Sequence, residues 1–180
     1  WGSNSVGQLG DGTLTDRWQH ASVTGLDSGV QAIAAGSAHT CALTAEGGVK
    51  CWGWNAYGQL GDGTTTDRLI PVNVSGLSSG VQAIATGNTH TCALTVGGGI
   101  KCWGYNEFGQ LGDISTTDRW TPVDVSEFPS GIQAIAAGKS HTCALTTGGG
   151  VKCWGRNNYG QLGDEQFDNW RLTPVDVSGL

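Results

Sequence analysis

Residues 41–63 read CALTAEGGVKCWGWNAYGQLGDG, and nearly the same phrase begins again at Cys92 and at Cys143. The tryptophan that follows the second cysteine recurs every 51 residues, at Trp1, Trp52, Trp103 and Trp154. A fixed period of this length indicates structural units that stack on one another. The 180 residues therefore form a single repeat array, with full units at 1–51, 52–102 and 103–153 and a partial unit at 154–180.

Each unit has the pattern of short β-strands. In the first copy, VQAIAAG, HTCALT and VKCWGWN are brief runs punctuated by glycine. PVNVSGL is a fourth run, in which Pro71 suits either the first residue of a strand or an edge strand. No stretch has the spacing of an amphipathic helix. Four short strands in about 51 residues predict an all-β fold built from propeller blades.

These residues also carry a family resemblance. His, then Ala-Leu, then Trp-Gly-x-Asn-x-x-Gly-Gln-Leu-Gly resembles the repeat of the regulator of chromosome condensation family, and the resemblance covers essentially the whole chain. It implies a seven-bladed β-propeller, which needs roughly 7 × 51 = 357 residues. Two copies of the chain would supply eight front halves and six back halves of a blade. We therefore expect a segment of a longer array instead of a two-chain ring.

The paired cysteines have a geometric interpretation. If their two strands fold back on each other, Cys41 faces Cys51, just as Leu43 faces Val49, because each pair of numbers sums to 92. Opposed Cα atoms lie about 4.5–5.5 Å apart, within disulfide range. We predict three disulfides, Cys41–Cys51, Cys92–Cys102 and Cys143–Cys153; buried free thiols and metal binding are the alternatives. Oxidised pairs would place the chain in a secreted, extracellular setting.

One further pattern is compatible with secretion. Asn73 begins the triplet Asn-Val-Ser, which is an acceptor pattern for N-glycosylation. A single such triplet also arises by chance in a chain this rich in serine and threonine.

The charge balance excludes some classes of partner. Nine basic residues stand against fifteen acidic ones, a net charge of −6, and the basic residues are scattered. Nucleic-acid binding depends on clustered Lys and Arg, so we expect none. No apolar run approaches the roughly 20 residues that span a bilayer.

Two motifs invite a catalytic or metal interpretation. Each repeated histidine (His39 in the first copy) precedes a cysteine by two residues, on the same strand face, and that cysteine has a better partner in the other cysteine. The family resemblance implies a structural role for this histidine, so we expect no catalytic residue and no cofactor.

The aspartates around a glycine turn, Asp11 with Asp16 and Asp62 with Asp67, resemble a calcium loop. They lack its bidentate glutamate. We expect no metal, and an Asp-stabilised turn with an Asp67–Arg68 pair on its rim.

The positions where the copies diverge are the candidate binding residues. Between WG and GQLG the copies collect aromatic and arginine side chains, the types enriched at interface hot spots: Trp54, Tyr57, Tyr105, Phe108, Arg156 and Tyr159. Stacked blades would set them side by side as an aromatic crescent. Alternatively, each ring merely packs on the loop of the next blade.

Together these features predict a non-catalytic, secreted binding or structural module that presents variable loops to a protein or a glycan. The family resemblance leaves two alternatives, because its members include exchange factors and chromatin binders as well as secreted inhibitors. One is a regulator of nucleotide exchange on a small GTPase. The other is an extracellular assembly with further copies of the same chain.

Overall fold

The computed structural model describes residues 1–128, 130–167 and 169–180, and within them the chain forms three four-stranded antiparallel sheets. The first sheet contains β1 (Val30–Ala35), β2 (His39–Thr44), β3 (Val49–Gly53) and β4 (Arg68–Asn73). The second contains β5 (Val81–Thr86), β6 (His90–Thr95), β7 (Ile100–Gly104) and β8 (Arg119–Asp124). The third contains β9 (Ile132–Ala137), β10 (His141–Thr146), β11 (Val151–Arg156) and β12 (Trp170–Asp176).

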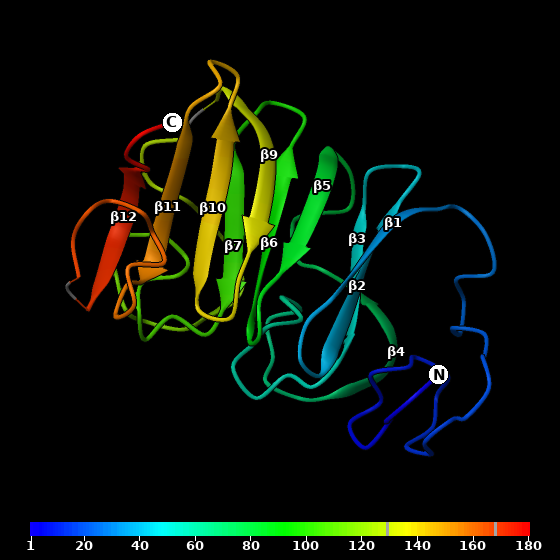
Figure 1. The fold of residues 1–180 in the computed structure, drawn as a ribbon. Helices are drawn as coiled ribbons and strands as arrows, with labels where there is room; N and C mark the ends of the chain where they lie inside the picture. Colours follow the sequence, from blue (N-terminus) through cyan, green and yellow to red (C-terminus); the bar gives the residue numbers. More distant parts are fainter. Residues whose placement is uncertain (129, 168) are drawn as a thin grey trace.

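The sheets follow one another as blades along an arc, which confirms the predicted all-β propeller architecture (Figure 1). In each sheet the strands lie in chain order, and β5 contacts both β1 and β9, so the first strands of the three blades are neighbours. The described residues include no helix long and apolar enough to cross a bilayer.

The blades are offset from the sequence repeats. The first sheet takes β1, β2 and part of β3 from unit 1–51 and β4 from the next unit. Residues 1–26 supply only the outer part of a preceding blade, where Gly2 bridges Arg17 as Gly53 pairs with Arg68 in the first sheet. The glycine-flanked runs of the sequence thus correspond to strands, although each blade joins pieces of two repeats.

The last strand of each blade is an edge strand that contains a proline. β4, β8 and β12 end the strand order of their sheets, and they contain Pro71, Pro122 and Pro174. β4 begins at Arg68, three residues before Pro71. The edge position, and not the strand start, therefore accommodates this residue without a backbone N–H.

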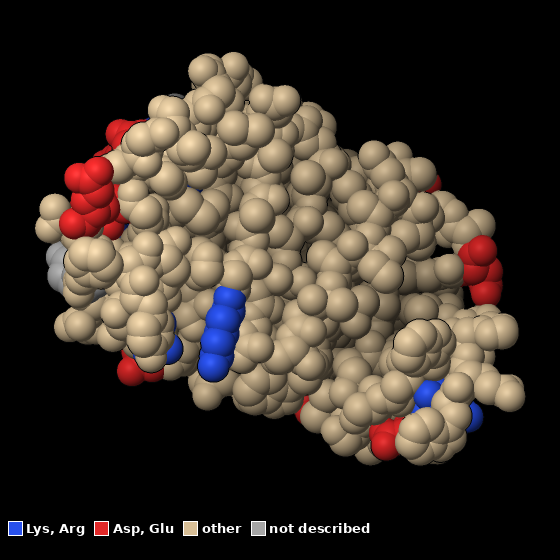
Figure 2. Space-filling view, in the orientation of Figure 1, with Lys and Arg blue, Asp and Glu red and all other residues tan. Residues whose placement is uncertain are grey.

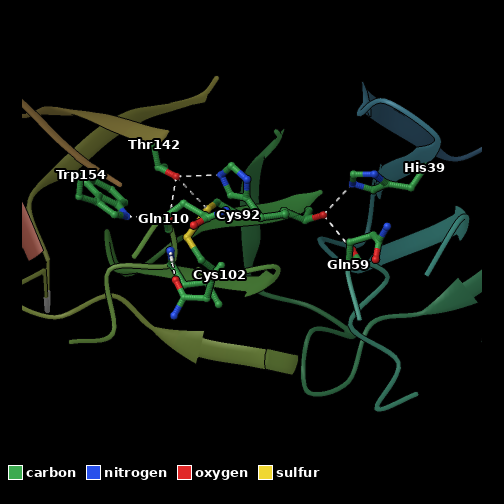
Figure 3. The surroundings of a disulfide bond; sticks show 11 residues. His39, Gln59, Cys92, Cys102, Gln110, Thr142 and Trp154 are labelled. Atoms are coloured by element: carbon green, nitrogen blue, oxygen red, sulfur yellow. Dashed lines mark hydrogen bonds between the residues drawn. A yellow bond between two sulfur atoms is a disulfide. The ribbon is translucent and has the colours of Figure 1, made fainter. Parts of the chain in front are cut away.

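The predicted disulfides are confirmed. Cys41 lies directly opposite Cys51 in the β2–β3 pair, with their Cα atoms 4.1 Å apart, and Cys92–Cys102 and Cys143–Cys153 repeat the arrangement (Figure 3). No cysteine in the described part of the chain is free. Each bond ties together the two central strands of its blade.

The cores lie between blades. The cysteine face of the first sheet, with Leu43 and Val49, packs against Ala93 and Trp103 of the second. The second sheet packs in the same way against Trp154 of the third. Trp52, Trp103 and Trp154 are buried and act as packing residues, whereas Trp1 is 79% exposed.

The two ends of the array display the surfaces that inner blades use on each other. Val81 is 3% exposed in the second blade, whereas its counterpart Val30 in the first blade is 38% exposed and Ile33 beside it is 69% exposed. At the other end, Cys143 and Leu145 are only half-buried, while their counterparts in the first two blades are buried. Both ends therefore expose apolar surface that is buried at the inner junctions.

Candidate binding surface

A buried polar ladder, the same at each junction, joins neighbouring blades. The Thr91 hydroxyl donates to the backbone carbonyl of Gln59 at 2.9 Å, and the Trp103 indole N–H donates to the same carbonyl at 2.9 Å. Thr142, Gln110 and Trp154 repeat this set at the next junction (Figure 3). The ladder therefore fixes the position of the Gln-Leu-Gly turn, because the turn carbonyl has two donors from the following blade.

The ladder also fixes the state of the repeated histidine. His39 Nε2 lies 3.0 Å from the Thr91 hydroxyl, whose single hydrogen is donated to Gln59, so Nε2 carries the proton and donates. Nδ1 has no hydrogen-bond partner among the described residues. Burial lowers the pKa of His39 to about 4 and that of His90 to about 3, with the other repeated histidines adding to the shift at His90. These are neutral structural residues, each used as a donor between blades.

The loop between the third and fourth strands of each blade is organised by a buried asparagine. The Asn55 side-chain amide donates to Asp62 Oδ1 and to the carbonyls of Thr64 and Thr66, while its Oδ1 accepts from the Leu60 N–H. Asn55 is fully buried, and the loops of the other copies carry the same residue at Asn4, Asn106 and Asn157. The asparagine holds the loop from inside, which leaves its outer positions free to vary.

The predicted ion pair on the rim of this loop is wrong. Arg68 pairs with Asp62, 2.7 Å away, because its side chain reaches back over the turn. Asp67 instead accepts the Asn55 backbone N–H at 2.8 Å. Both Asp62 oxygens are engaged by N–H and O–H donors, and the described residues contain no cluster of three metal-ligating side chains. Hydrogen bonds to these donors close the turn.

The six variable residues are brought together into the aromatic crescent, which follows the loops from one blade to the next. Trp54 contacts Tyr57, with ring centroids 5.4 Å apart, and Tyr57 contacts Tyr105 of the next blade at 4.7 Å. Tyr105 continues to Phe108 at 6.2 Å. The guanidinium of Arg156 then covers the ring of Phe108 at 5.0 Å and that of Tyr159 at 5.7 Å.

Burial in the crescent is compatible with both interpretations of the divergent loops. Five of its members are partly buried, because each packs against a neighbour along the row, and Tyr159 is 81% exposed. Ring contacts of this kind contribute about 0.5–1.5 kcal/mol beyond the area they bury. The row thus joins adjacent loops, and each of its side chains still has part of its surface in contact with solvent.

Two tryptophans beside the crescent were missed by sequence reasoning. Trp170 packs against Phe108 with centroids 6.3 Å apart, and Trp120 lies beside Tyr105 and Glu107 around a shared hollow. Trp120 occupies the position that holds Leu69 in the first blade. The signal was a position just outside the divergent segment that alternates between tryptophan and leucine, as Trp18, Leu69, Trp120 and Leu172.

The candidate glycosylation residue has a structural partner. Asn73 ends β4, its side chain is exposed, and its Oδ1 accepts a hydrogen bond from Lys50 Nζ at 2.7 Å. The same position holds Asp124 in the next blade, where Lys101 pairs with it. The asparagine thus takes part in a lysine contact that recurs along the outer strands, and glycosylation stays a prediction.

Charged side chains are sparse on the face of the molecule that Figure 2 shows, and no cluster of Lys and Arg occurs among the described residues seen there. The basic residues are mostly paired instead, as Arg17 is with Asp11 and Arg119 with Asp113. This face lacks the clustered positive charge with which proteins bind nucleic acids.

Comparison with known proteins agrees with the geometry. The model of the regulator of chromosome condensation (RCC1) repeat matches residues 1–43, 46–94 and 98–145, and a second model of the same repeat matches 30–59, 81–110 and 132–161. The chain is 35% identical to the ultraviolet-B receptor UVR8 of Arabidopsis thaliana over 166 residues, 91% of this chain and 38% of the receptor.

Solved structures show the same likeness. Human WBSCR16 superposes with a TM-score of 0.83 at 25% identity, over 97% of this chain and 46% of that one. Yeast RCC1 (Prp20), solved bound to Kap60, superposes at 0.81 with 23% identity, over 98% of this chain and 43% of that one. The chain thus spans less than half the length of these proteins. With its repeats matched and its blades superposed, the chain belongs to the regulator of chromosome condensation repeat family.

Proposed function

We propose that the chain is a non-catalytic binding module that uses the aromatic crescent to hold a partner protein. The observation that carries the proposal is the unbroken row of contacts from Trp54 to Tyr159 at positions where the repeats otherwise diverge. Side chains that only pack within a blade have reason to agree between copies, as the polar ladder does. Yeast RCC1, whose structure was solved bound to Kap60, offers a protein-binding precedent in this fold.

A protein partner is favoured over a glycan by the chemistry of the row. Aromatic rings alone stack well on sugars, but this row also contains Arg156 and lies beside the carboxylates of Glu107 and Asp118. Aromatic side chains together with arginine are enriched at the centres of protein interfaces, which are surrounded by a polar rim.

The first repeat supplies a graft that tests the crescent. It carries Ser3 and Val6 where the next two copies carry aromatic residues, and its loop keeps the same asparagine hydrogen bonds. The variant Trp54→Ser, Tyr57→Val, Tyr105→Ser, Phe108→Val should therefore fold. Wild type and graft are compared on a displayed peptide library and on a glycan array.

The proposal expects peptide sequences that bind wild type and lose at least about tenfold in affinity for the graft, in line with hot-spot losses above 1 kcal/mol. Peptides that bind wild type and the graft with equal affinity would contradict the proposal. Binders found only on the glycan array would replace the protein partner with a glycan.

The proposed setting is extracellular. Three disulfides at the centres of the blades, with five of the six cysteines buried, are typical of proteins that fold in an oxidising compartment. The test is alkylation of natively purified protein under denaturing conditions without reductant, read by intact mass. No added label is expected, and six labels would contradict the proposal.

Self-association through the end faces is a second candidate. Val30 and Ile33 are exposed at one end of the array, and Leu145 and its neighbours are partly exposed at the other. At the inner junctions the equivalents of these two surfaces pack against each other. Charged substitution Ile33→Asp would then dissociate the assembly in sedimentation velocity. A mass that is independent of concentration in the wild type would exclude this candidate.

A further inference from the structure

The same surface has an open hollow of about 540 Å³ in the second blade, called here the acidic pocket. The residues that line it are Tyr105, Glu107, Thr116, Thr117, Asp118 and Trp120. All of these residues come from the β7–β8 loop or the start of β8. The Asn106 side chain anchors the loop from below by donating to the carbonyls of Ser115 and Thr117. The pocket is thus held by the same hydrogen bonds that organise every loop of the array.

The pocket has negative charge that the described residues leave without a basic partner. No ion pair joins Lys or Arg to Glu107 or Asp118 in the described part of the chain, and the neighbouring Arg119 is directed at Asp113, 2.8 Å away. Burial, together with the charge of Glu107, raises the pKa of Asp118, although the Asn106 backbone N–H opposes the shift. Glu107 itself accepts from the Tyr105 hydroxyl. The two carboxylates therefore repel each other across the pocket.

The walls of the pocket are aromatic. Tyr105 is half-buried in the crescent, while Trp120 is 53% exposed and contributes its ring to the rim. A cation is attracted to the face of a tryptophan or tyrosine ring, and more strongly where carboxylates share the site. Rings and carboxylates together are complementary to a planar guanidinium, which stacks on the rings while it donates to the oxygens.

The combination occurs in one copy of the repeat. Where this loop has Tyr105, Glu107 and Trp120, the previous copy has Trp54, Ala56 and Leu69, and the next has Arg156, Asn158 and Leu172. The first copy has Ser3, Ser5 and Trp18 at these positions, so no other copy carries all three residues and the fold does not require the set.

The next loop shows what the pocket lacks. Arg156 stands at the position of Tyr105 and covers the rings of Phe108 and Tyr159 from within the chain. Arg156 of the third blade thus supplies a cation to Phe108 of the second blade and to Tyr159 of its own loop. Among the described residues no such cation contact is found at the pocket rings, Tyr105 and Trp120.

We propose that the acidic pocket binds an arginine side chain of the partner protein, with the aromatic crescent beside it holding the rest of the partner segment. This inference deepens the proposed function and depends on it for the source of the arginine. The hollow is open to solvent, so a small free cation in it would keep much of its contact with water. This favours a side chain that is held in place by the rest of a polypeptide.

The test uses three fluorescent peptides of identical length, (Gly-Ser-Arg)₃, (Gly-Ser-Lys)₃ and (Gly-Ser-Gln)₃, titrated with the chain and read by anisotropy. The variants are Glu107→Ala and Trp120→Leu, which install residues that the previous copy carries at the same positions. Glu46→Ala, which removes an exposed carboxylate from the turn after β2, is the matched control for net charge. Retained disulfides and an unchanged Tm show that each variant is folded.

The arginine peptide should bind wild type and the Glu46→Ala control alike, and bind the double variant about tenfold more weakly, as loss of a cation–π contact and a carboxylate partner predicts. The lysine peptide should bind more weakly than the arginine peptide, and the glutamine peptide should not bind. Equal affinity of wild type and the double variant, or equal binding of the arginine and glutamine peptides, would overturn the pocket.

A reduced crescent graft, Trp54→Ser, Tyr57→Val, Phe108→Val, leaves Tyr105 in the pocket and separates the two proposals. Selected peptides that lose affinity for this reduced graft but keep it for Glu107→Ala, Trp120→Leu would leave the crescent as the binding surface and remove the acidic pocket from it. Loss in the pocket variants alone would reject the crescent and keep the pocket.

Discussion

The polar ladder between blades and the aromatic crescent on their loops lie only a few residues apart in each repeat, yet the copies treat them oppositely. His39, Thr91 and Gln59 recur with the same partners at each junction, whereas Trp54 becomes tyrosine and then arginine. The ladder residues are buried, and each one takes part in a specific hydrogen bond between blades. The crescent is held from below by the asparagine, so its outer residues are free to differ. Burial therefore separates residues that hold the blades together from residues available for recognition.

The largest expected difference between the ladder and the crescent is in the response of stability to acid, because the ladder contains buried histidines. The pKa of His39 and His90 in the folded chain, about 4 and about 3, lies below the ordinary value of 6.5. The unfolded chain therefore binds more protons below pH 6.5, and the stability that neutral histidine supplies is lost as pH falls towards those values. Each histidine should contribute a slope of about 1.4 kcal/mol per pH unit over that window.

Urea unfolding between pH 7 and pH 4 measures this slope. His90→Gln should flatten it by about one proton, while the crescent graft should leave it unchanged. A slope that His90→Gln does not alter would show that another group governs the acid sensitivity.

Substitution of two tryptophans, one buried between blades and one on a loop, compares the two regions by their effect on stability. Trp103 is fully buried between blades and donates to Gln59, so Trp103→Ala should cost about 3–5 kcal/mol of unfolding free energy. Trp120→Leu, on the exposed loop side, should change stability by less than about 0.5 kcal/mol. Chemical denaturation at pH 7 gives both values, and similar losses at the two sites would erase the distinction.

The disulfides should have an intermediate effect. Cys92 and Cys102 close a loop with a sequence separation of 10, so replacing both with alanine should cost somewhat under about 3 kcal/mol. The variant should still bind the peptides that wild type binds, because the bond lies in the blade centre. Loss of binding without loss of stability would link the bond to the crescent itself.

Two asparagines provide the smallest contrast. Asn55 is fully buried and makes several hydrogen bonds, so Asn55→Ala should destabilise the chain by about 1–3 kcal/mol. Asn73 is exposed with one lysine contact, and Asn73→Ala should have an effect within about 0.5 kcal/mol. Thermal unfolding of the two variants side by side checks the pair; equal shifts would contradict the role given to the buried asparagine.

The repeated features could be predicted from sequence because they are local or periodic. The sum rule that opposes Cys41 to Cys51 needs only two strands and a turn, and the strand pairing has that register. The 51-residue period of the tryptophans predicted units that stack, and Trp103 and Trp154 are buried where neighbouring blades meet.

The features that could not be predicted depend on contacts across a turn or between blades. Arg68 reaches Asp62 instead of its sequence neighbour Asp67, since Asn55 occupies Asp67. Trp120 entered the pocket only because β8 brings it beside Tyr105. The sequence period does not indicate contacts of this kind, so the acidic pocket could be recognised only in the structure.

The prolines of the outer strands have a consequence for how such an array avoids aggregation. An exposed sheet edge is a template on which another chain can add a strand, which is the first step of aggregation. Pro71, Pro122 and Pro174 each delete one amide hydrogen from that edge, and the pairing beside each is already irregular. The edge strand of each of the three sheets thus contains a residue that disfavours the addition of a further strand.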